Sequence, residues 1–166
     1  MKQKTSAGLA IIYDNKILLA HPTNRRWYNS YGIPKGGVDK GETYLEAAIR
    51  ETKEEVGIKV PKKLIDKKEN TFFVSSSPKK KKGYNKVVYY YVVKIDNLSQ
   101  LGINDLRIPK NQLQLDEVDW AGFLDYEEVQ KRITPSQIPL INNLISKGLL
   151  ESTILNYERF IESKKS

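Results

Sequence analysis

Cysteine is absent from this chain of 166 residues, and histidine occurs once, at His21. Without cysteine there is no disulfide, no thiol nucleophile and no thiolate metal site, and such a composition fits a reducing cytosol. A single histidine excludes histidine-rich zinc sites, and a Ser-His-Asp triad would depend on that one residue. The carboxylates therefore remain as the side chains from which a catalytic set can be built.

Long hydrophobic runs are also absent, since no apolar stretch approaches the roughly 18 residues that a membrane-spanning helix needs. Residues 1–4 lead directly into a β-rich segment rather than into the apolar region of a signal peptide. The length suits one domain, covering residues 1–166, with a sizeable core. We therefore expect a single cytoplasmic domain that has no membrane partner.

The positive charge of the chain, +8 in total, is concentrated in one segment. Between residues 59 and 86 there are ten lysines and two acids, Asp66 and Glu69, so this segment alone accounts for the excess. The lysines are Lys59, Lys62, Lys63, Lys67, Lys68, Lys79, Lys80, Lys81, Lys82 and Lys86. Two interpretations stay open: an electropositive rim for polyphosphate or nucleic acid, or a solvated lysine-rich loop.

The segment 36–58, GGVDKGETYLEAAIRETKEEVGI, predicts a loop followed by a helix over residues 44–56. Thr43 and Glu46 have the spacing of a capping box at the start of a helix. Apolar residues then recur at helical spacing and form a stripe to be buried. Gly57 stands where a left-handed residue is needed to end the helix.

Three glutamates lie on one side of this predicted helix, Glu51, Glu54 and Glu55, at spacings of three and four residues. Like charges at these spacings destabilise a helix by a few tenths of a kcal/mol per pair. A hard cation such as Mg²⁺, held by carboxylates and substrate phosphate, would stabilise such a group. An ordinary solvated acidic face is the alternative for any glutamate cluster.

The complete spacing decides between these interpretations. Gly36, Glu42, the pair Arg50-Glu51, the pair Glu54-Glu55 and Gly57-Ile58 stand in a pattern that resembles the box of the Nudix (MutT-like) hydrolases, G-x5-E-x7-R-E-U-x-E-E-x-G-U with U aliphatic. The one departure is Thr52 at the first aliphatic position, where its β-branched shape is kept.

The resemblance implies a hydrolase that cleaves a phosphoanhydride bond in a nucleoside diphosphate derivative with Mg²⁺ or Mn²⁺. It implies metal ligation by Glu51, Glu54 and Glu55, by Glu42 at a second ion, and by the backbone at Lys35 and Gly36. Arg50 would hold a glutamate in place. Glu117, before the last predicted strand, is a further catalytic candidate, although an ordinary turn carboxylate fits equally well.

Strand patterns lie on both sides of the box, and helical patterns follow it. We expect strands at residues 6–13, 16–20, 31–33, 71–74 and 86–95, a turn and final strand at 116–124, and a hairpin turn at Asp14-Asn15. Residues 75–85 are expected to form a polar loop and residues 97–114 to be irregular. Helices are expected at residues 126–133, from the Thr134-Pro135 cap to Gly148, and at 152–163. This order favours an α/β/α sandwich with a mixed sheet, which the resemblance also implies.

Two loops carry candidate substrate contacts. Arg25, Arg26, Trp27 and Tyr28 offer guanidinium groups for phosphate and rings for a base, although packing of Trp27 against the sheet is as good an interpretation. Lys35 in the catalytic loop, and Lys79, Lys80, Lys81 and Lys82 in the polar loop, are expected to attract the phosphates of the substrate.

The substrate class stays open at this stage. The sequence looks like the dinucleoside-polyphosphate and diphosphoinositol-polyphosphate branches of the family, so a small nucleotide or polyphosphate is the expected partner. An RNA 5′-end (cap or triphosphate) pyrophosphohydrolase, with RNA as partner, is the alternative that the basic segment favours. A non-catalytic nucleotide-binding module is the second alternative. The oligomeric state is not indicated.

Overall fold

The structure, a computed structural model, describes residues 2–65 and 72–165. In these residues six strands form one mixed sheet in the order β4-β5-β1-β2-β6, with β3 paired to β1. The strands are β1 (Lys2–Tyr13), β2 (Lys16–Pro22), β3 (Lys35–Gly37), β4 (Phe72–Lys79), β5 (Tyr84–Ile95) and β6 (Val118–Leu124). The helices are α1 (Tyr44–Val56), α2 (Tyr126–Arg132), α3 (Ile138–Ser146) and α4 (Thr153–Lys165).

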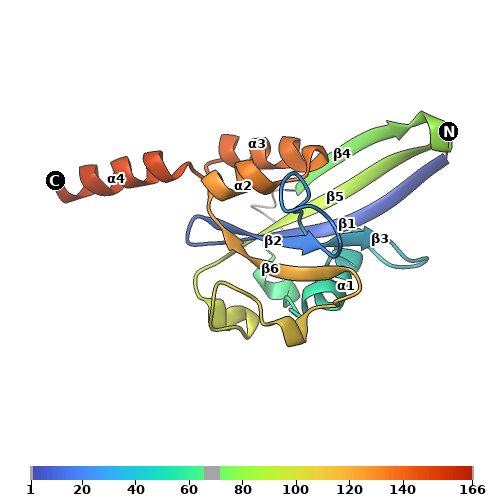
Figure 1. The fold of residues 1–166 in the computed structure, drawn as a ribbon, viewed down its shortest axis with the longest axis horizontal. Helices are drawn as coiled ribbons and strands as arrows, with labels where there is room; N and C mark the ends of the chain where they lie inside the picture. The colour runs from blue at the N-terminus through green and yellow to red at the C-terminus, as the bar shows by residue number, and fades with distance from the viewer. Residues whose placement is uncertain (1, 66–71, 166) are drawn as a thin grey trace.

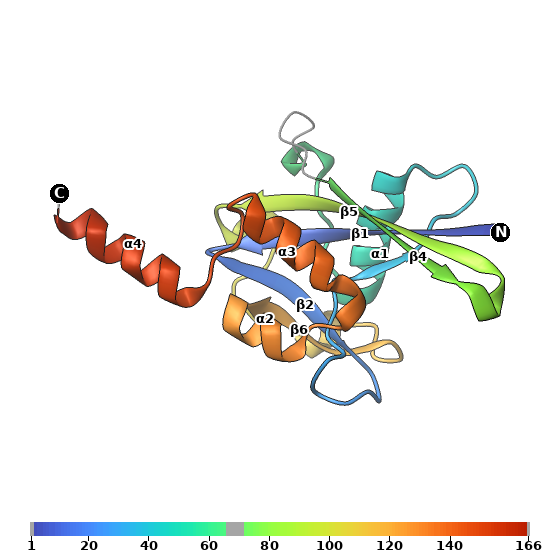
Figure 2. The same ribbon diagram turned by 90° about the horizontal axis from the view of Figure 1, so that it is seen from above.

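Helices cover both faces of the sheet (Figure 1). Alternate residues of the strands point to opposite faces: Leu9 and Ile11 join the core beneath α1, whereas Ala10 and Ile12 join the core beneath α2 and α3. The predicted α/β/α sandwich is therefore confirmed. Helix α4 extends away from these layers in both views (Figures 1 and 2).

Strand β1 is longer than predicted because its whole length pairs in parallel with β5, from Lys2 beside Tyr84 to Tyr13 beside Ile95. The predicted hairpin after β1 is confirmed, with Asp14 and Asn15 both in the left-handed region that a two-residue turn requires.

Strand β2 leaves β1 soon after this hairpin and pairs with β6 instead. The short strand β3 occupies the edge of β1 that β2 has left, with Lys35 opposite Gly8 and Gly37 opposite Ser6. The chain between β2 and β3 therefore lies where the two strands diverge, and it lines a cavity there.

Helix α1 has the predicted bounds, and its caps explain them. Thr43 accepts a hydrogen bond from the Glu46 amide, and the Glu46 side chain accepts one from the Thr43 amide. Gly57 is left-handed, and an added Cβ would lie 2.6 Å from the Gln112 carbonyl oxygen. Thr52 is buried, and its hydroxyl donates to the Ala48 carbonyl at 2.9 Å, which satisfies the polar group that departs from the aliphatic pattern.

Two predicted elements are wrong. Residues 31–33 form only isolated bridges, Tyr31 to Ile133 and Gly32 to Ala20, and the strand lies two residues beyond them as β3. Residues 75–85 are not a loop, because β4 continues to Lys79 and pairs with β5 up to Tyr84. Lysine and proline suit an edge strand such as this one, where they discourage further pairing. Thr71, the first residue of the strand predicted there, lies outside the described residues.

The remaining elements agree more closely with expectation. The predicted irregular segment contains the short 3₁₀ turns η3 (Leu98–Leu101) and η4 (Lys110–Gln112). Thr134 makes no side-chain cap, and a 3₁₀ turn, η5 (Pro135–Gln137), precedes α3. Within the described residues, no helix has the length and apolarity to cross a membrane.

Candidate active site

Arg50 in α1 joins the preceding loop to the helix through one guanidinium group. Its Nε donates to Glu42 Oε2 at 2.8 Å, and its Nη1 donates to Glu51 Oε1 at 2.9 Å and to Glu54 Oε2 at 3.2 Å. Its Nη2 donates to the Gly37 carbonyl at 2.8 Å and to Glu42 Oε1 at 2.9 Å. Because the donors of a guanidinium have fixed directions, these bonds fix the loop before α1 relative to the helix. They also hold the pKa of Glu42 down to about 2.

Gly36 lies directly against the carboxylate of Glu51. A Cβ added to Gly36 would stand 2.2 Å from Glu51 Cδ and within 2.4 Å of both carboxylate oxygens. A glycine is therefore required for the β3 backbone to approach this carboxylate. A Cβ added to the next residue, Gly37, would meet no atom within 4 Å.

Glu55, one turn along from Glu51, faces a cavity of about 270 Å³ where β2 and β3 diverge. Lys35 and Glu117 line the same cavity, together with the 3₁₀ turn η5. Glu55 Oε2 is buried and has no hydrogen-bond partner among the described residues. A buried carboxylate oxygen without a partner is costly, so this atom is the most unusual feature of the cavity.

Burial is also the main cause of the pKa shifts of the ionisable side chains at this cavity. It raises the pKa of Glu55 to about 8, and the neighbouring Glu51 and Glu117 carboxylates add to the rise. Burial lowers the pKa of Lys35 to about 8, and the nearby Lys86 ammonium lowers it further. The pKa of Glu51 is raised by burial as well, against the opposing effect of Arg50. Shifts of this kind concentrate at functional sites.

The structure brings together only part of the predicted ligand set. The Glu51 and Glu117 carboxylates are close enough to raise the pKa of Glu55, and Glu117 and Glu54 act on Glu51 in the same direction. Glu42 and the exposed Glu54 are bonded to Arg50, as Glu51 also is. Within residues 2–65 and 72–165, no three carboxylate or histidine side chains are already arranged as a complete metal site. The metal and catalytic roles of these residues stay predictions.

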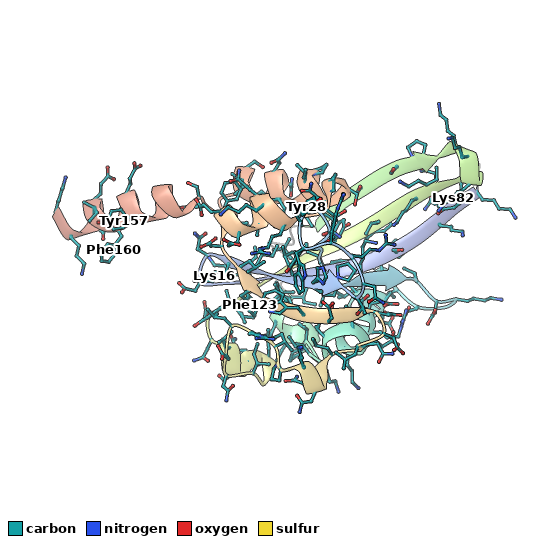
Figure 3. The ribbon with its side chains drawn as sticks, in the orientation of Figure 1. Lys16, Tyr28, Lys82, Phe123, Tyr157 and Phe160 are labelled. Atoms are coloured by element: carbon teal, nitrogen blue, oxygen red, sulfur yellow. The ribbon has the colours of Figure 1, made fainter. Side chains whose placement is uncertain are left out.

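The loop of residues 23–30 borders a second cavity, of about 580 Å³, which shares Pro22, Ser30 and Thr134 with the first. Arg25 and Arg26 line it. Tyr28 is exposed beside Arg26, whose guanidinium lies 4.9 Å from the ring centre (Figure 3).

Trp27 packs against the sheet through His21 of β2, while its role as a substrate contact stays a prediction. One face stacks on the buried His21 with ring centres 4.1 Å apart, and the side chain is still 56% exposed. His21 is held in turn by Asp119 and by the Arg26 carbonyl. No local pattern indicated the His21–Asp119 pair, because the two residues are far apart in the chain.

The four adjacent lysines do not reach the carboxylates. Lys79 ends β4, and Lys80, Lys81 and Lys82 form the 3₁₀ turn η2 (Lys80–Lys82) at the tip of the β4–β5 hairpin, where Figure 3 labels Lys82. Tyr84, beside this tip, pairs with Lys2 at the start of β1. Gly8, which pairs with Lys35 at the cavity, lies six residues further along β1. At about 3.3 Å per residue, this places the tip ~20 Å from the cavity. Lys67, Lys68, Asp66 and Glu69 lie outside the described residues.

Gln137 is a residue of the site that the sequence did not indicate, although it lines the cavity with Lys35 and Glu55. It is buried, and its Oε1 accepts a hydrogen bond from the Ile33 amide at 2.8 Å. It also bonds to the Tyr90 side chain. Gln137 thus connects η5 to the chain before β3. A glutamine in a loop-to-helix segment has no sequence signature that would indicate this role.

A family model described as NUDIX domain matches residues 2–144. The chain belongs to the NUDIX family. The predicted recognition is thereby confirmed, and the box residues of this NUDIX chain are those that surround Arg50 and Glu55.

The curated relatives of this NUDIX chain match it over short stretches. An RNA pyrophosphohydrolase of Pelagibacter ubique is 42% identical over 57 residues, which are 34% of this chain and 35% of the relative. An ADP-ribose pyrophosphatase of Methanocaldococcus jannaschii is 47% identical over 49 residues, 30% of this chain and 28% of the relative. The matched stretches thus span about a third of these relatives.

Solved structures resemble the NUDIX chain over most of its length. A MutT NUDIX hydrolase from Burkholderia pseudomallei has a TM-score of 0.59 at 21% identity, covering 87% of this chain and 97% of that one. A bifunctional NMN adenylyltransferase/ADP ribose pyrophosphatase from Francisella tularensis, complexed with AMP and Mn ion, has a TM-score of 0.65 at 16% identity, covering 87% and 42%. At these identities the likeness shows the shared fold.

Proposed function

We propose that this chain hydrolyses a phosphoanhydride bond in a nucleoside diphosphate derivative, with Mg²⁺ or Mn²⁺ as cofactor. The observation that carries the proposal is the unpartnered Glu55 Oε2, buried at a cavity that also contains Lys35 and Glu117. Membership of the NUDIX family and the pyrophosphohydrolase names of the curated relatives support it.

The donor set fits a divalent cation. A hard cation prefers oxygen ligands, and it would satisfy Glu55 Oε2 and offset the repulsion between the Glu51 and Glu55 carboxylates. Glu51 and Glu55 would hold it together with the backbone at Lys35 and Gly36, and Glu54 and Glu42 are the further ligands that we propose. When bound, the ion polarises a phosphoryl oxygen and makes bound water more acidic.

The protein side chains position the reaction around that ion. The fork of Arg50 holds Glu51 against Gly36, so the carboxylate is already positioned before substrate binds. Lys35 places a cation in the cavity beside the phosphates. In the hydrolysis itself, the oxygen of water forms a bond to one phosphorus while the bridging P–O bond breaks. The departing phosphate takes the electron pair of that bond, and a proton of the water passes to a glutamate of the site.

The substrate fits the two adjoining cavities best as a phosphate chain with a group at its far end. The phosphates would lie near Lys35 and Glu55, and the far group would lie near Arg25, Arg26 and the exposed rings of Trp27 and Tyr28. Dinucleoside polyphosphates and diphosphoinositol polyphosphates have this form. We also propose a cytoplasmic location, supported by the absence of cysteine, and one domain across residues 1–166.

A second candidate function is that of an RNA pyrophosphohydrolase, which cleaves the cap or the triphosphate at the 5′ end of RNA. The RNA pyrophosphohydrolases among the curated relatives favour it, as do the lysines of the β4–β5 hairpin. A non-catalytic nucleotide-binding module is less well supported, because a module that only binds has no need of the buried Glu55.

A substrate panel tests the proposed function. Nucleoside triphosphates, ADP-ribose, dinucleoside polyphosphates, diphosphoinositol polyphosphates and 5′-triphosphorylated or capped RNA are incubated with the protein and Mg²⁺, and again with a chelator. We expect metal-dependent cleavage of at least one class. Binding of nucleotides without turnover of any of them, with either Mg²⁺ or Mn²⁺, would favour the binding module.

A further inference from the structure

Lysines from three strands share one face of the sheet beyond the helical layers. Lys2 lies opposite Tyr84, Lys4 lies opposite Lys86, and Lys79 lies opposite Tyr84 from the other side. Residues opposite one another on neighbouring strands point to the same face, so these four lysines form one group, which we call the lysine tract. The amino group of Lys4 confirms the orientation, since it lies 4.5 Å from the centre of the Tyr84 ring.

The lysine tract continues to the candidate active site. Gly8 lies four residues beyond Lys4 on β1, therefore on the same face, and Lys35 lies opposite Gly8. The ammonium groups of Lys35 and Lys86 are near enough to repel each other. Cations thus line a path of ~20 Å, six residues of β1 at about 3.3 Å each, from the hairpin tip to the cavity that contains Glu55.

The lysine tract has no ion-pair partner in the part of the chain that the structure describes. The ion pairs of residues 2–65 and 72–165 involve Lys16, His21, Arg50, Lys131 and Arg132. The lysines of η2 are also outside these pairs, and with Lys79 they border a surface hollow of about 460 Å³ at the tip. An extended polyanion would neutralise all of these cations, whereas a mononucleotide would reach only the Lys35 end.

Building on the proposed hydrolase activity, we propose that the lysine tract binds the sugar–phosphate backbone of a single-stranded RNA whose 5′-terminal phosphates occupy the Lys35–Glu55 cavity. Side chains on one strand face recur about every 6.6 Å, a spacing that successive phosphates of an extended strand can match. Contacts to phosphates position a nucleic acid without reading its sequence. RNA is the fitting polymer because its 5′ triphosphate contains the anhydride bonds that the site would cleave.

Chain length is the variable that tests this proposal. The substrates carry a 5′ triphosphate and increase from a single nucleotide to about eight nucleotides. The test variant is Lys2→Ser/Lys4→Ser/Lys79→Ser. Its matched control is Lys59→Ser/Lys62→Ser/Lys63→Ser, which removes the same charge from exposed positions around η1 (Lys62–Leu64), on the side of the sheet that carries α1.

We expect the test variant to raise KM for the longest RNA about tenfold or more at low salt, with KM for the single nucleotide and kcat changed less than about twofold. The slope of log affinity against log salt should become shallower by about 2, close to 0.7 for each phosphate of a single strand that the variant no longer neutralises. The control variant should behave as the unmodified protein. Equal losses for short and long substrates, or equal losses in the two variants, would overturn the proposal.

Direct binding separates this proposal from the proposed function. Fluorescence anisotropy of a labelled 5′-triphosphorylated RNA reports the tract whether or not turnover occurs. If the protein binds this RNA through the tract but cleaves no anhydride, the hydrolase proposal alone fails. If it cleaves mononucleotides and long RNA with equal efficiency and binds them equally, the tract proposal alone fails.

Discussion

Replacement of Gly36 by alanine should impair activity with little effect on folding. The added Cβ would lie 2.2 Å from Glu51 Cδ, whereas ordinary contact begins at 3.4 Å. The Glu51 carboxylate must therefore retreat by about 1 Å, a displacement that can cost roughly 100-fold in rate when it affects a catalytic group. Because the carboxylate is the end of a flexible side chain, it can move without unfolding the helix, although its 2.9 Å bond to Arg50 would break.

The assay compares kcat/KM, Mg²⁺ dependence and melting temperature for Gly36→Ala and Gly37→Ala. Gly37 is the matched control, since an added Cβ there meets nothing within 4 Å. We expect kcat/KM to fall about 100-fold for Gly36→Ala and to stay near the unmodified value for Gly37→Ala, with both melting temperatures close to normal. Normal turnover and normal Mg²⁺ dependence in a folded Gly36→Ala protein would refute the placement of Glu51 in the site.

Arg50→Ala should lower the free energy of unfolding by about 1–3 kcal/mol because it leaves Glu42, Glu51 and Glu54 without their shared donor; urea unfolding measures this, and Arg50→Lys should recover little because an ammonium cannot fork. The pKa of Glu42 is about 2 in the folded protein against an ordinary 4.5, so its stabilising effect is full above pH 4.5 and is lost as the pH falls towards 2. The free energy of unfolding of Glu42→Gln should therefore be lower than that of the unmodified protein at neutral pH, and the two values should converge near pH 2. A difference that stays constant with pH would contradict the assignment. Trp27→Ala should lower stability by about 0.5–1.5 kcal/mol because the His21 ring loses its stacking partner, and Tyr28→Ala should leave it unchanged. If both variants keep normal KM as folded proteins, their loop contributes no stacking to substrate. Glu54→Gln should remove most turnover while the melting temperature stays level or rises slightly, and near-normal activity with unchanged Mg²⁺ dependence would exclude Glu54 from the metal site.

Local signals in the sequence predicted the bounds of α1 well. The capping box at Thr43, the apolar stripe and Gly57 act within one helix, so they are visible in a single segment. The β1–β2 hairpin followed equally from Asp14 and Asn15, which tolerate the left-handed region. Where neighbouring residues determine structure, the sequence was sufficient.

Elements that depend on distant partners were harder to predict. Serine, proline and lysine in residues 75–79 suggested a loop, yet pairing with β5 makes them an edge strand. Tyr31 and Gly32 looked like strand residues, but β2 and β3 leave them only isolated bridges. In each case the pairing partner decides the outcome, and composition does not identify that partner.

In the candidate site, too, features set by neighbouring residues were predictable and features set by distant partners were not. Spacing identified the glutamates of α1 as candidates, the family resemblance added Glu117, and the structure brings Glu117 to the cavity of Glu55. The contact of Gln137 with the Ile33 amide depends on packing between elements. The same is true of the hydrogen bonds from Arg50 to Gly37 and Glu42, which lie outside α1. These interactions could not be predicted from the sequence because no local pattern specifies which residues will meet across the sheet.

Mg²⁺-dependent turnover by Glu55→Gln is the most direct test of the proposed hydrolase. The substrate is the one that the unmodified protein cleaves best, and Lys53→Gln, an exposed change on the same helix, is the control. The variant keeps the shape of Glu55 but removes the carboxylate that we propose as a metal ligand and as one of the glutamates able to take the proton of water. Turnover should therefore fall by about 100-fold or more, with the control unaffected. Turnover of Glu55→Gln equal to that of Lys53→Gln, at the same Mg²⁺ concentration, would contradict the account.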